Sequence, residues 1–181
     1  MKTPHAMACA LALLATAPQL TFADNALLPP LIPGYGEVTP VENAGERPDP
    51  ALDYKVVLNA TKGGGNDAPA PFLDKAAKVA NLLAQSGVAA GHRHIVVILQ
   101  GPATLAVLNP VGLKARNLAR NPSADLIAKL NAAGVSVRVC GQALAAAHIG
   151  REEVLPGIQV DLSALTTVSA LQLRGYALLV D

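Results

Sequence analysis

The feature that most constrains the fold of this chain is one short apolar run near its middle. Residues 94–99 read His-Ile-Val-Val-Ile-Leu, with five consecutive apolar side chains. A strand with one face in solvent alternates apolar and polar side chains, whereas a strand inside a parallel sheet is apolar on both faces. This run therefore predicts a parallel strand with other elements packed against both of its sides.

Strand and helix patterns alternate around this run. Apolar residues recur three and four positions apart over residues 72–85, and a second predicted helix spans 123–133, with Ser123 as its N-cap and Gly134 at its end. Further helices are expected at 141–149 and 163–173, and strands at 54–59, 94–99, 135–139, 158–162 and 176–180. Such alternation predicts right-handed crossovers in one α/β domain, residues 53–181, whose five mainly parallel strands carry helices on both faces.

The first residues have the pattern of an export signal. Lys2 and His5 precede an apolar run over residues 6–17, and Thr21 and Ala23 stand where a signal peptidase reads small residues. We therefore interpret residues 1–23 as a signal peptide cleaved after Ala23, and expect a periplasmic or secreted protein. The alternative is a buried N-terminal helix. No apolar run reaches the length that spans a bilayer, so we expect no membrane association after cleavage.

Residues 24–52 contain six prolines and show neither a helical nor an alternating period. This pattern predicts an extended arm rather than a domain. Apolar residues such as Leu31, Ile32 and Tyr35 are unusual in a solvated linker. We expect the arm to pack either on the domain or on a neighbouring subunit.

Charge argues against two classes of partner. The chain has 14 Lys and Arg against 13 Asp and Glu, and the predicted cleavage removes Lys2 alone, which leaves 13 of each. A neutral protein without a basic cluster or interleaved aromatic residues lacks the features of a nucleic-acid binder or a membrane-surface protein. We therefore predict neither partner.

Cysteine use singles out one residue. Cys9 leaves with the signal peptide, so Cys140 has no partner in the mature chain. An unpaired thiol in an oxidising compartment is buried and inert, paired with another molecule, or reactive. Cys140 falls where a predicted strand ends and a helix begins, and helix amides favour a thiolate. Cysteine is also among the most buried residue types, so simple packing is the alternative.

Polar residues after the first two strands complete a predicted site. Ligands of open parallel sheets bind beyond the carboxyl ends of the strands, and these ends carry Asn59 and Lys62 after the first strand and Gln100 after the second. We predict that these three residues line a pocket around Cys140, and that the amides of Gly141 and Gln142 stabilise its anion.

Several familiar sites are missing from the sequence. Lys62 precedes the glycines of residues 63–65, so the phosphate-loop spacing is absent, and the dinucleotide pattern is absent as well. The four histidines do not form a metal-ligand constellation, and His148 lies about two helical turns from Cys140, too far to act as its base. We predict no cofactor and no metal.

Together these segments resemble the DsrE/DsrF-like (YchN-like) family, and especially its exported members of unassigned function. The likeness rests on Val-Arg-Val-Cys-Gly at 137–141, Leu-Pro-Gly-Ile-Gln-Val at 155–160 and Leu-Gln-Leu-Arg-Gly-Tyr-Ala at 171–177, in this order, with Gln-Gly-Pro at 100–102. The resemblance implies a three-layer α/β/α sandwich, assembly into trimers or hexamers, and a persulfide-carrying cysteine at the position of Cys140. Gln100 stands where many relatives have histidine.

We therefore expect a periplasmic protein that binds or transfers sulfur through Cys140, as a sulfurtransferase-like carrier with a donor or acceptor protein. The resemblance implies a homotrimer or homohexamer. The alternative is a non-catalytic oligomeric module for small-ligand binding or assembly, in which Cys140 is structural.

Overall fold

The protein is a three-layer α/β/α sandwich, as the sequence predicted. The structure, a computed structural model, describes residues 28–65 and 67–180. Its sheet is parallel throughout, in the order β4-β3-β2-β1-β5. The strands are β1 (Tyr54–Ala60), β2 (Arg93–Leu99), β3 (Ser136–Cys140), β4 (Gln159–Asp161) and β5 (Ala177–Leu179). The predicted signal peptide lies outside the described residues.

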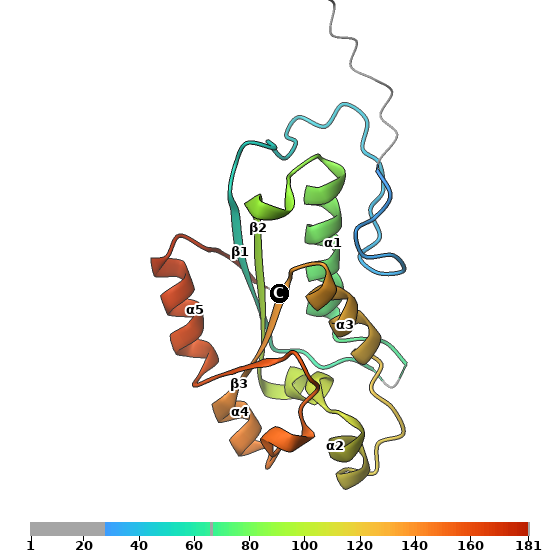
Figure 1. Cartoon of the computed structure of the whole chain (residues 1–181), viewed down its shortest axis with the longest axis vertical. Coiled ribbons are helices and arrows are strands. Elements are labelled where there is room, and N and C mark those ends of the chain that lie inside the picture. The colour runs from blue at the N-terminus through green and yellow to red at the C-terminus, as the bar shows by residue number, and fades with distance from the viewer. Residues whose placement is uncertain (1–27, 66, 181) are drawn as a thin grey trace, which may run out of the picture.

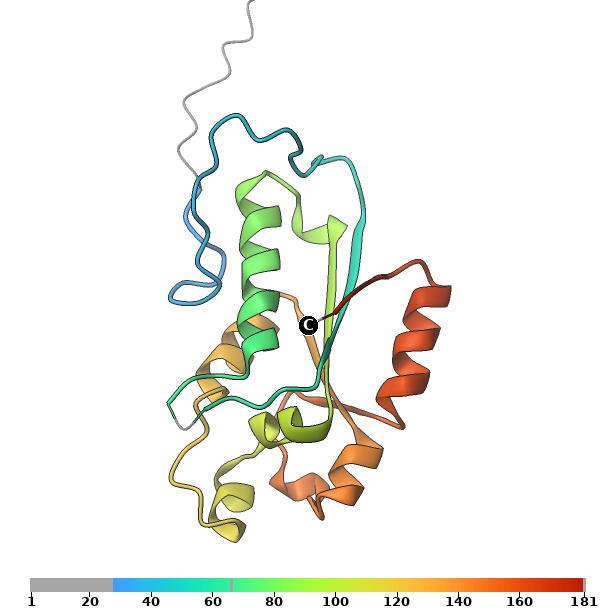
Figure 2. The same ribbon diagram turned by 180° about the vertical axis from the view of Figure 1, so that it is seen from behind.

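Helices cover both faces of this sheet, with α1 and α3 on one side and α5 on the other (Figures 1 and 2). The helices are α1 (Pro71–Gln85), α2 (Pro110–Ala115), α3 (Ala124–Ala132), α4 (Gly141–Ala146) and α5 (Ala164–Leu173). Short 3-10 helices are η1 (Ala90–His92), η2 (Gly101–Val107) and η3 (Arg151–Glu153). No helix of the described residues is both long and apolar enough to cross a membrane.

The apolar run of β2 explains why two layers of helix are needed. Its residues Ile95, Val97 and Leu99 belong to the core beneath α1 and α3. Val96 and Ile98 point the other way, into a second cluster with Val168 and Leu171 of α5. The alternation of strand side chains divides the run between the two cores, which confirms that this strand is buried on both faces.

Two local predictions need correction, and one helix was not predicted. Ser123 occupies the N-cap position of α3, as predicted, but its side chain does not bond the helix amides; its Oγ accepts a hydrogen bond from Ala70 N–H at 3.0 Å. The helix expected at 141–149 ends at Ala146, since His148 adopts a left-handed backbone conformation with φ of 51°. The sequence analysis missed α2, whose N-cap Asn109 accepts hydrogen bonds from Val111 N–H and Gly112 N–H.

The arm folds back onto its own domain. Ile32 is fully buried in the main core, and its N–H donates to Oδ1 of Asn81 on α1 at 2.8 Å. The Asn81 Nδ2 group donates to Tyr35 O at 2.9 Å and Gly36 O at 3.0 Å. One buried amide side chain therefore satisfies three backbone groups of a segment that has no helix or strand of its own.

Two further contacts fix the arm beyond Asn81. Gly36 has φ of +59°, and a Cβ there would lie 2.2 Å from Lys78 N, so only glycine can approach α1 this closely. Tyr35 Oη donates to Asp125 Oδ2 at 3.0 Å, and Lys129 Nζ lies 4.9 Å from the centre of the tyrosine ring. The arm is therefore attached to both helices of this layer.

Replacing Asn81 by alanine should loosen the arm without altering the sheet. Buried N–H and C=O groups that lose their partner typically cost about 1–3 kcal/mol, so we expect a loss of that size in the free energy of unfolding, measured with urea. Limited proteolysis should cut the variant earlier between residues 37 and 53. Lys114→Ala, an exposed change on α2, is the control, and equal stability of the two variants would contradict this account of the arm.

Candidate functional site

The site is centred on Cys140, the last residue of β3. In the sheet its Cα is paired with Asp161 of β4, and it precedes α4 directly. Its neighbour Val139 is paired with Leu99, after which the chain continues to Gln100. Cys140 therefore lies at the carboxyl edge of the sheet, where parallel-sheet proteins bind their ligands.

The sulfur atom of Cys140 contacts α5, the helix on the face of the sheet that α1 and α3 do not cover. Sγ of Cys140 accepts a hydrogen bond from Ala164 N–H at 3.2 Å. Ala164 is the first residue of the ten-residue helix α5, and the Ser163 side chain caps that helix by accepting from Leu165 N–H. The unpaired amides and the positive dipole end of a helix can stabilise negative charge, so the start of α5 places an N–H donor and a partial positive charge at the sulfur atom.

Cys140 is nearly enclosed. Its exposed fraction is 4%, and it packs in the second apolar cluster with Val57, Val96 and Ile98 of the sheet and with α5. The glycine after it is required by close packing, because a Cβ on Gly141 would lie 2.8 Å from Asp161 O. The thiol is free and almost completely shielded from solvent.

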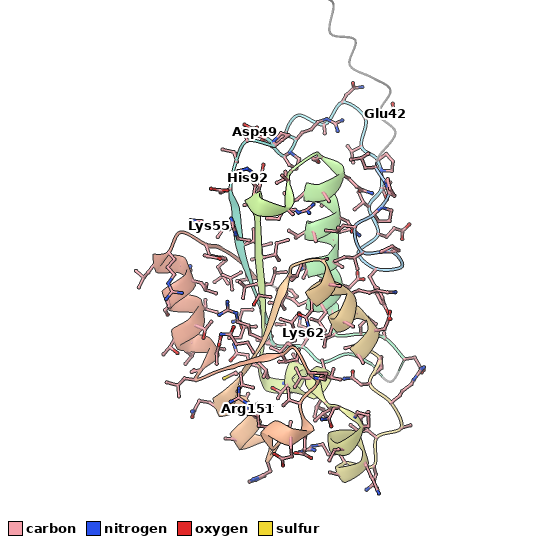
Figure 3. The ribbon with its side chains drawn as sticks, viewed as in Figure 1. Glu42, Asp49, Lys55, Lys62, His92 and Arg151 are labelled. Carbon is pink, nitrogen blue, oxygen red and sulfur yellow. The ribbon has the colours of Figure 1, made fainter. Side chains whose placement is uncertain are left out.

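Two of the predicted pocket residues meet on the same face of the sheet as Cys140. Gln100 Nε2 donates to Asn59 Oδ1 at 2.7 Å, and the alternation from Val57 and Ile98 directs both side chains toward α5. Lys62 lies in the exposed loop after β1 (Figure 3). Gln142 is exposed on α4. The roles expected for all five residues, Asn59, Lys62, Gln100, Gly141 and Gln142, remain predictions.

A polar groove adjoins the cysteine, and sequence analysis missed it. A cavity of about 290 Å³ lies between α5 and strands β3 and β4, with Arg138, Asp161, Thr167 and Arg174 in its wall. Arg138 Nη1 is 3.5 Å from Asp161 Oδ2, which also accepts from Thr167 Oγ1 at 2.9 Å. Positive, negative and hydroxyl groups thus lie beside a thiol that is itself in an apolar cluster.

One of these residues could have been found in the sequence. Arg138 precedes Cys140 by two positions in a strand, and residues i and i+2 share a face. The signal for Ala164 was absent, because a backbone amide has no side-chain signature and its contact spans 24 positions.

The histidines lie elsewhere. His92 (Figure 3) lies just before the start of β2, and its Nδ1 is 2.7 Å from Asp53 Oδ1. Cys140 is at the opposite edge of the parallel sheet, because it ends β3. Hydrogen bonding to His92 lowers the pKa of Asp53. His148 follows α4, and its carbonyl oxygen accepts from Arg116 Nη2 at 2.9 Å. Within residues 28–65 and 67–180, no group of three His, Cys, Asp or Glu is placed to hold a metal ion.

Comparison with known proteins agrees with this architecture. A model of the DsrE/DsrF-like family matches residues 57–180. A protein of unknown function, MTH1491 from Methanobacterium thermoautotrophicum, superposes with a TM-score of 0.55 at 19% identity, covering 71% of this chain and 100% of that one. The ychN protein from E. coli gives 0.52 and 16%, covering 71% and 99%. No curated protein sequence matches this chain.

The charge of Asp161 should control which reagents reach Cys140. Asp161→Asn removes a negative charge beside the thiol and leaves Arg138 without its ion-pair partner, so an anionic disulfide reagent should react faster relative to neutral iodoacetamide. Charges about 4 Å apart in a solvated setting interact by about 1 kcal/mol, which predicts a rise of about fivefold in the ratio of the two rates. Stopped-flow labelling measures both, and Glu152→Gln is the exposed control. An unchanged ratio would show that Asp161 is electrostatically remote from the sulfur.

Proposed function

This chain belongs to the DsrE/DsrF-like family, and from that premise we propose that it binds or transfers sulfur through Cys140. Family membership points to a role connected with sulfur transfer. Beyond this general role, we propose that Cys140 is a thiolate that carries sulfane sulfur as a persulfide. The protein would then be a sulfur carrier with a donor or acceptor protein as its partner.

The observation that carries the proposal is the hydrogen bond from Ala164 N–H to Sγ of Cys140 at 3.2 Å. A persulfide formed on Cys140 bears its negative charge on the outer sulfur. The head of α5 and the groove that contains Arg138 and Arg174 supply partial and full positive charge on this side of the sheet. The start of α5 and these arginines can therefore stabilise the negative charge of both the thiolate and the persulfide anion.

The proposed step balances with a polysulfide as donor. The Cys140 thiolate attacks the protonated terminal sulfur of a hydropolysulfide, and a new S–S bond forms as the bond between that sulfur and its neighbour breaks. The electron pair of the broken bond leaves with the shortened polysulfide. Cys140 then carries one added sulfur atom, and attack by an acceptor thiolate on that sulfur would return the original thiolate.

A second function is supported by a different observation. Cys140 is 4% exposed in an apolar cluster, whereas Leu165 and Leu173 on the outer side of α5 are 75% and 90% exposed. Large apolar side chains exposed together on one helix are typical of a surface that another protein covers. In this alternative the protein is an oligomeric binding or assembly module, α5 faces a second subunit, and Cys140 serves packing alone.

Mass spectrometry of the intact protein after treatment with polysulfide separates the two functions. The carrier function predicts additions of about 32 Da per sulfur atom, removed by dithiothreitol. These additions should be absent in Cys140→Ser, which keeps a hydrogen-bond acceptor for Ala164 N–H. Since this is the sole cysteine of the described residues, wild-type protein that stays unmodified would favour the packing function.

We also propose that the protein is exported and assembles with itself. The signal-peptide pattern of residues 1–23 supports a periplasmic or secreted location. The exposed leucines of α5 and the family resemblance support a homotrimer or homohexamer.

Native mass spectrometry of protein recovered from a periplasmic fraction checks both proposals together. The expected chain begins at Asp24, and the expected assembly has three or six copies. Leu173→Gln should weaken the assembly because it places a polar group in an apolar contact, whereas Gln142→Ala should leave it unchanged. A monomeric wild-type protein at micromolar concentration would contradict self-assembly, and a chain that retains Met1 would contradict export.

A further inference from the structure

A second cavity lies away from Cys140 and takes no part in the proposed sulfur chemistry. It has a volume of about 390 Å³, and its wall comes from residues 64, 65, 67 and 68, from η2 and α2, and from residues 118–123. It shares no wall residue with the groove beside Cys140. Small-molecule pockets of proteins typically occupy about 300–1,000 Å³. The cavity is therefore large enough for a small organic ligand.

The cavity lies past the carboxyl ends of the first two strands. Its wall includes residues that follow β1 and residues of η2, which follows β2. Ligands of open parallel sheets bind beyond these ends of the strands. Gly64, Gly65, Asp67 and Ala68, which line the cavity, all follow β1.

The wall of the cavity is partly apolar and open to solvent. Leu105 and Leu118 line it and are 46% and 43% exposed, and Leu113 lies beside them. Leucine side chains gathered around one hollow favour a ligand with an apolar body over a fully polar one.

Most polar groups of the wall are already used within the protein. Asn121 Nδ2 donates to Ala106 O at 2.7 Å and to Leu108 O at 2.9 Å, while its Oδ1 accepts from Ser123 N–H at 2.9 Å. Ser123 Oγ is bound by Ala70 N–H. These side chains hold the loops together, which leaves them little capacity to recognise a ligand.

Arg120 is the exception. Its guanidinium carries five N–H donors, and Asp67 Oδ1 accepts from Nη2 across the cavity wall. No second acceptor contacts Arg120 in the described part of the chain. The side chains of Arg120 and Asp67 are 62% and 83% exposed, and such exposed pairs are worth about 0–1 kcal/mol. A ligand carboxylate can therefore replace Asp67 at small cost.

We propose that this cavity binds a small carboxylic acid with a short apolar body. The carboxylate takes the place of Asp67 on Arg120, where a planar guanidinium matches two carboxylate oxygens. The apolar body lies along the wall formed by Leu105, Leu113 and Leu118. Since Asp67 competes for Arg120 from within the chain, it acts as a weak internal occupant of the site.

Isothermal titration calorimetry of the full protein with octanoate tests the proposal, with octanamide and octylammonium as neutral and cationic probes of the same length. Octanoate should bind saturably, and both other probes more weakly. Arg120→Gln should weaken octanoate binding about tenfold or more, as expected for loss of a charged hydrogen-bond partner. Asp67→Asn should strengthen it up to about fivefold, because it removes the competing carboxylate.

Two controls make the outcome decisive. Arg151→Gln changes an exposed arginine that is not in the cavity wall (Figure 3), and octanoate affinity should be unchanged. The thermal melting of each variant confirms that it is folded. Equal binding of octanoate and octanamide, stronger binding of octylammonium, no saturable binding at millimolar octanoate, or weaker octanoate binding by Asp67→Asn would each overturn the proposal.

Discussion

Burial of β1 and β2 on both faces is the constraint on which the rest of this domain depends. Val57 and Ile98 face α5, while Leu58 and Leu99 face α1 and α3, and all four are fully buried. A sheet of this kind requires a helix layer on each side. The last crossover returns the chain across β1 to form β5, and it supplies α5 as the cover of the second face. That same crossover brings the start of α5 to Cys140, so one packing requirement also creates the environment of the thiol.

The two sides of the sheet are used differently. The arm covers part of the α1 and α3 side of the sheet. Asn81 holds it there through hydrogen bonds to backbone groups of Ile32, Tyr35 and Gly36. At the carboxyl end, Arg116 pairs with Glu153 at 2.8 Å and lowers the pKa of that carboxyl, which joins α2 to η3. The α5 side keeps exposed leucines and a polar groove. The arm therefore covers the α1 and α3 side, while the thiol lies on the α5 side.

The sequence predicted what depends on local periodicity. The run at 94–99 and the helical spacing of 72–85 led to the correct fold class, because alternation and helix period are read from neighbouring residues. Partners far apart in the chain could not be predicted in this way. Ser123 has the residue type of a helix cap, yet it binds Ala70, which is 53 positions away. The sequence pattern placed Cys140 at the end of a strand. Its contact with the Ala164 amide could not be predicted, because that contact depends on the order of the strands in the sheet, which no local pattern encodes.

The central claim is that Cys140 reacts in the folded protein even though its exposed fraction is 4%. The rate of its alkylation by iodoacetamide, measured across low urea concentrations, tests this most directly, because a local opening and global unfolding respond differently to denaturant. The account predicts a rate that is nearly independent of urea until unfolding begins. A rate that rises in proportion to the unfolded fraction from the lowest urea concentrations would mean that the thiol is accessible only in the unfolded chain, and would contradict a carrier function.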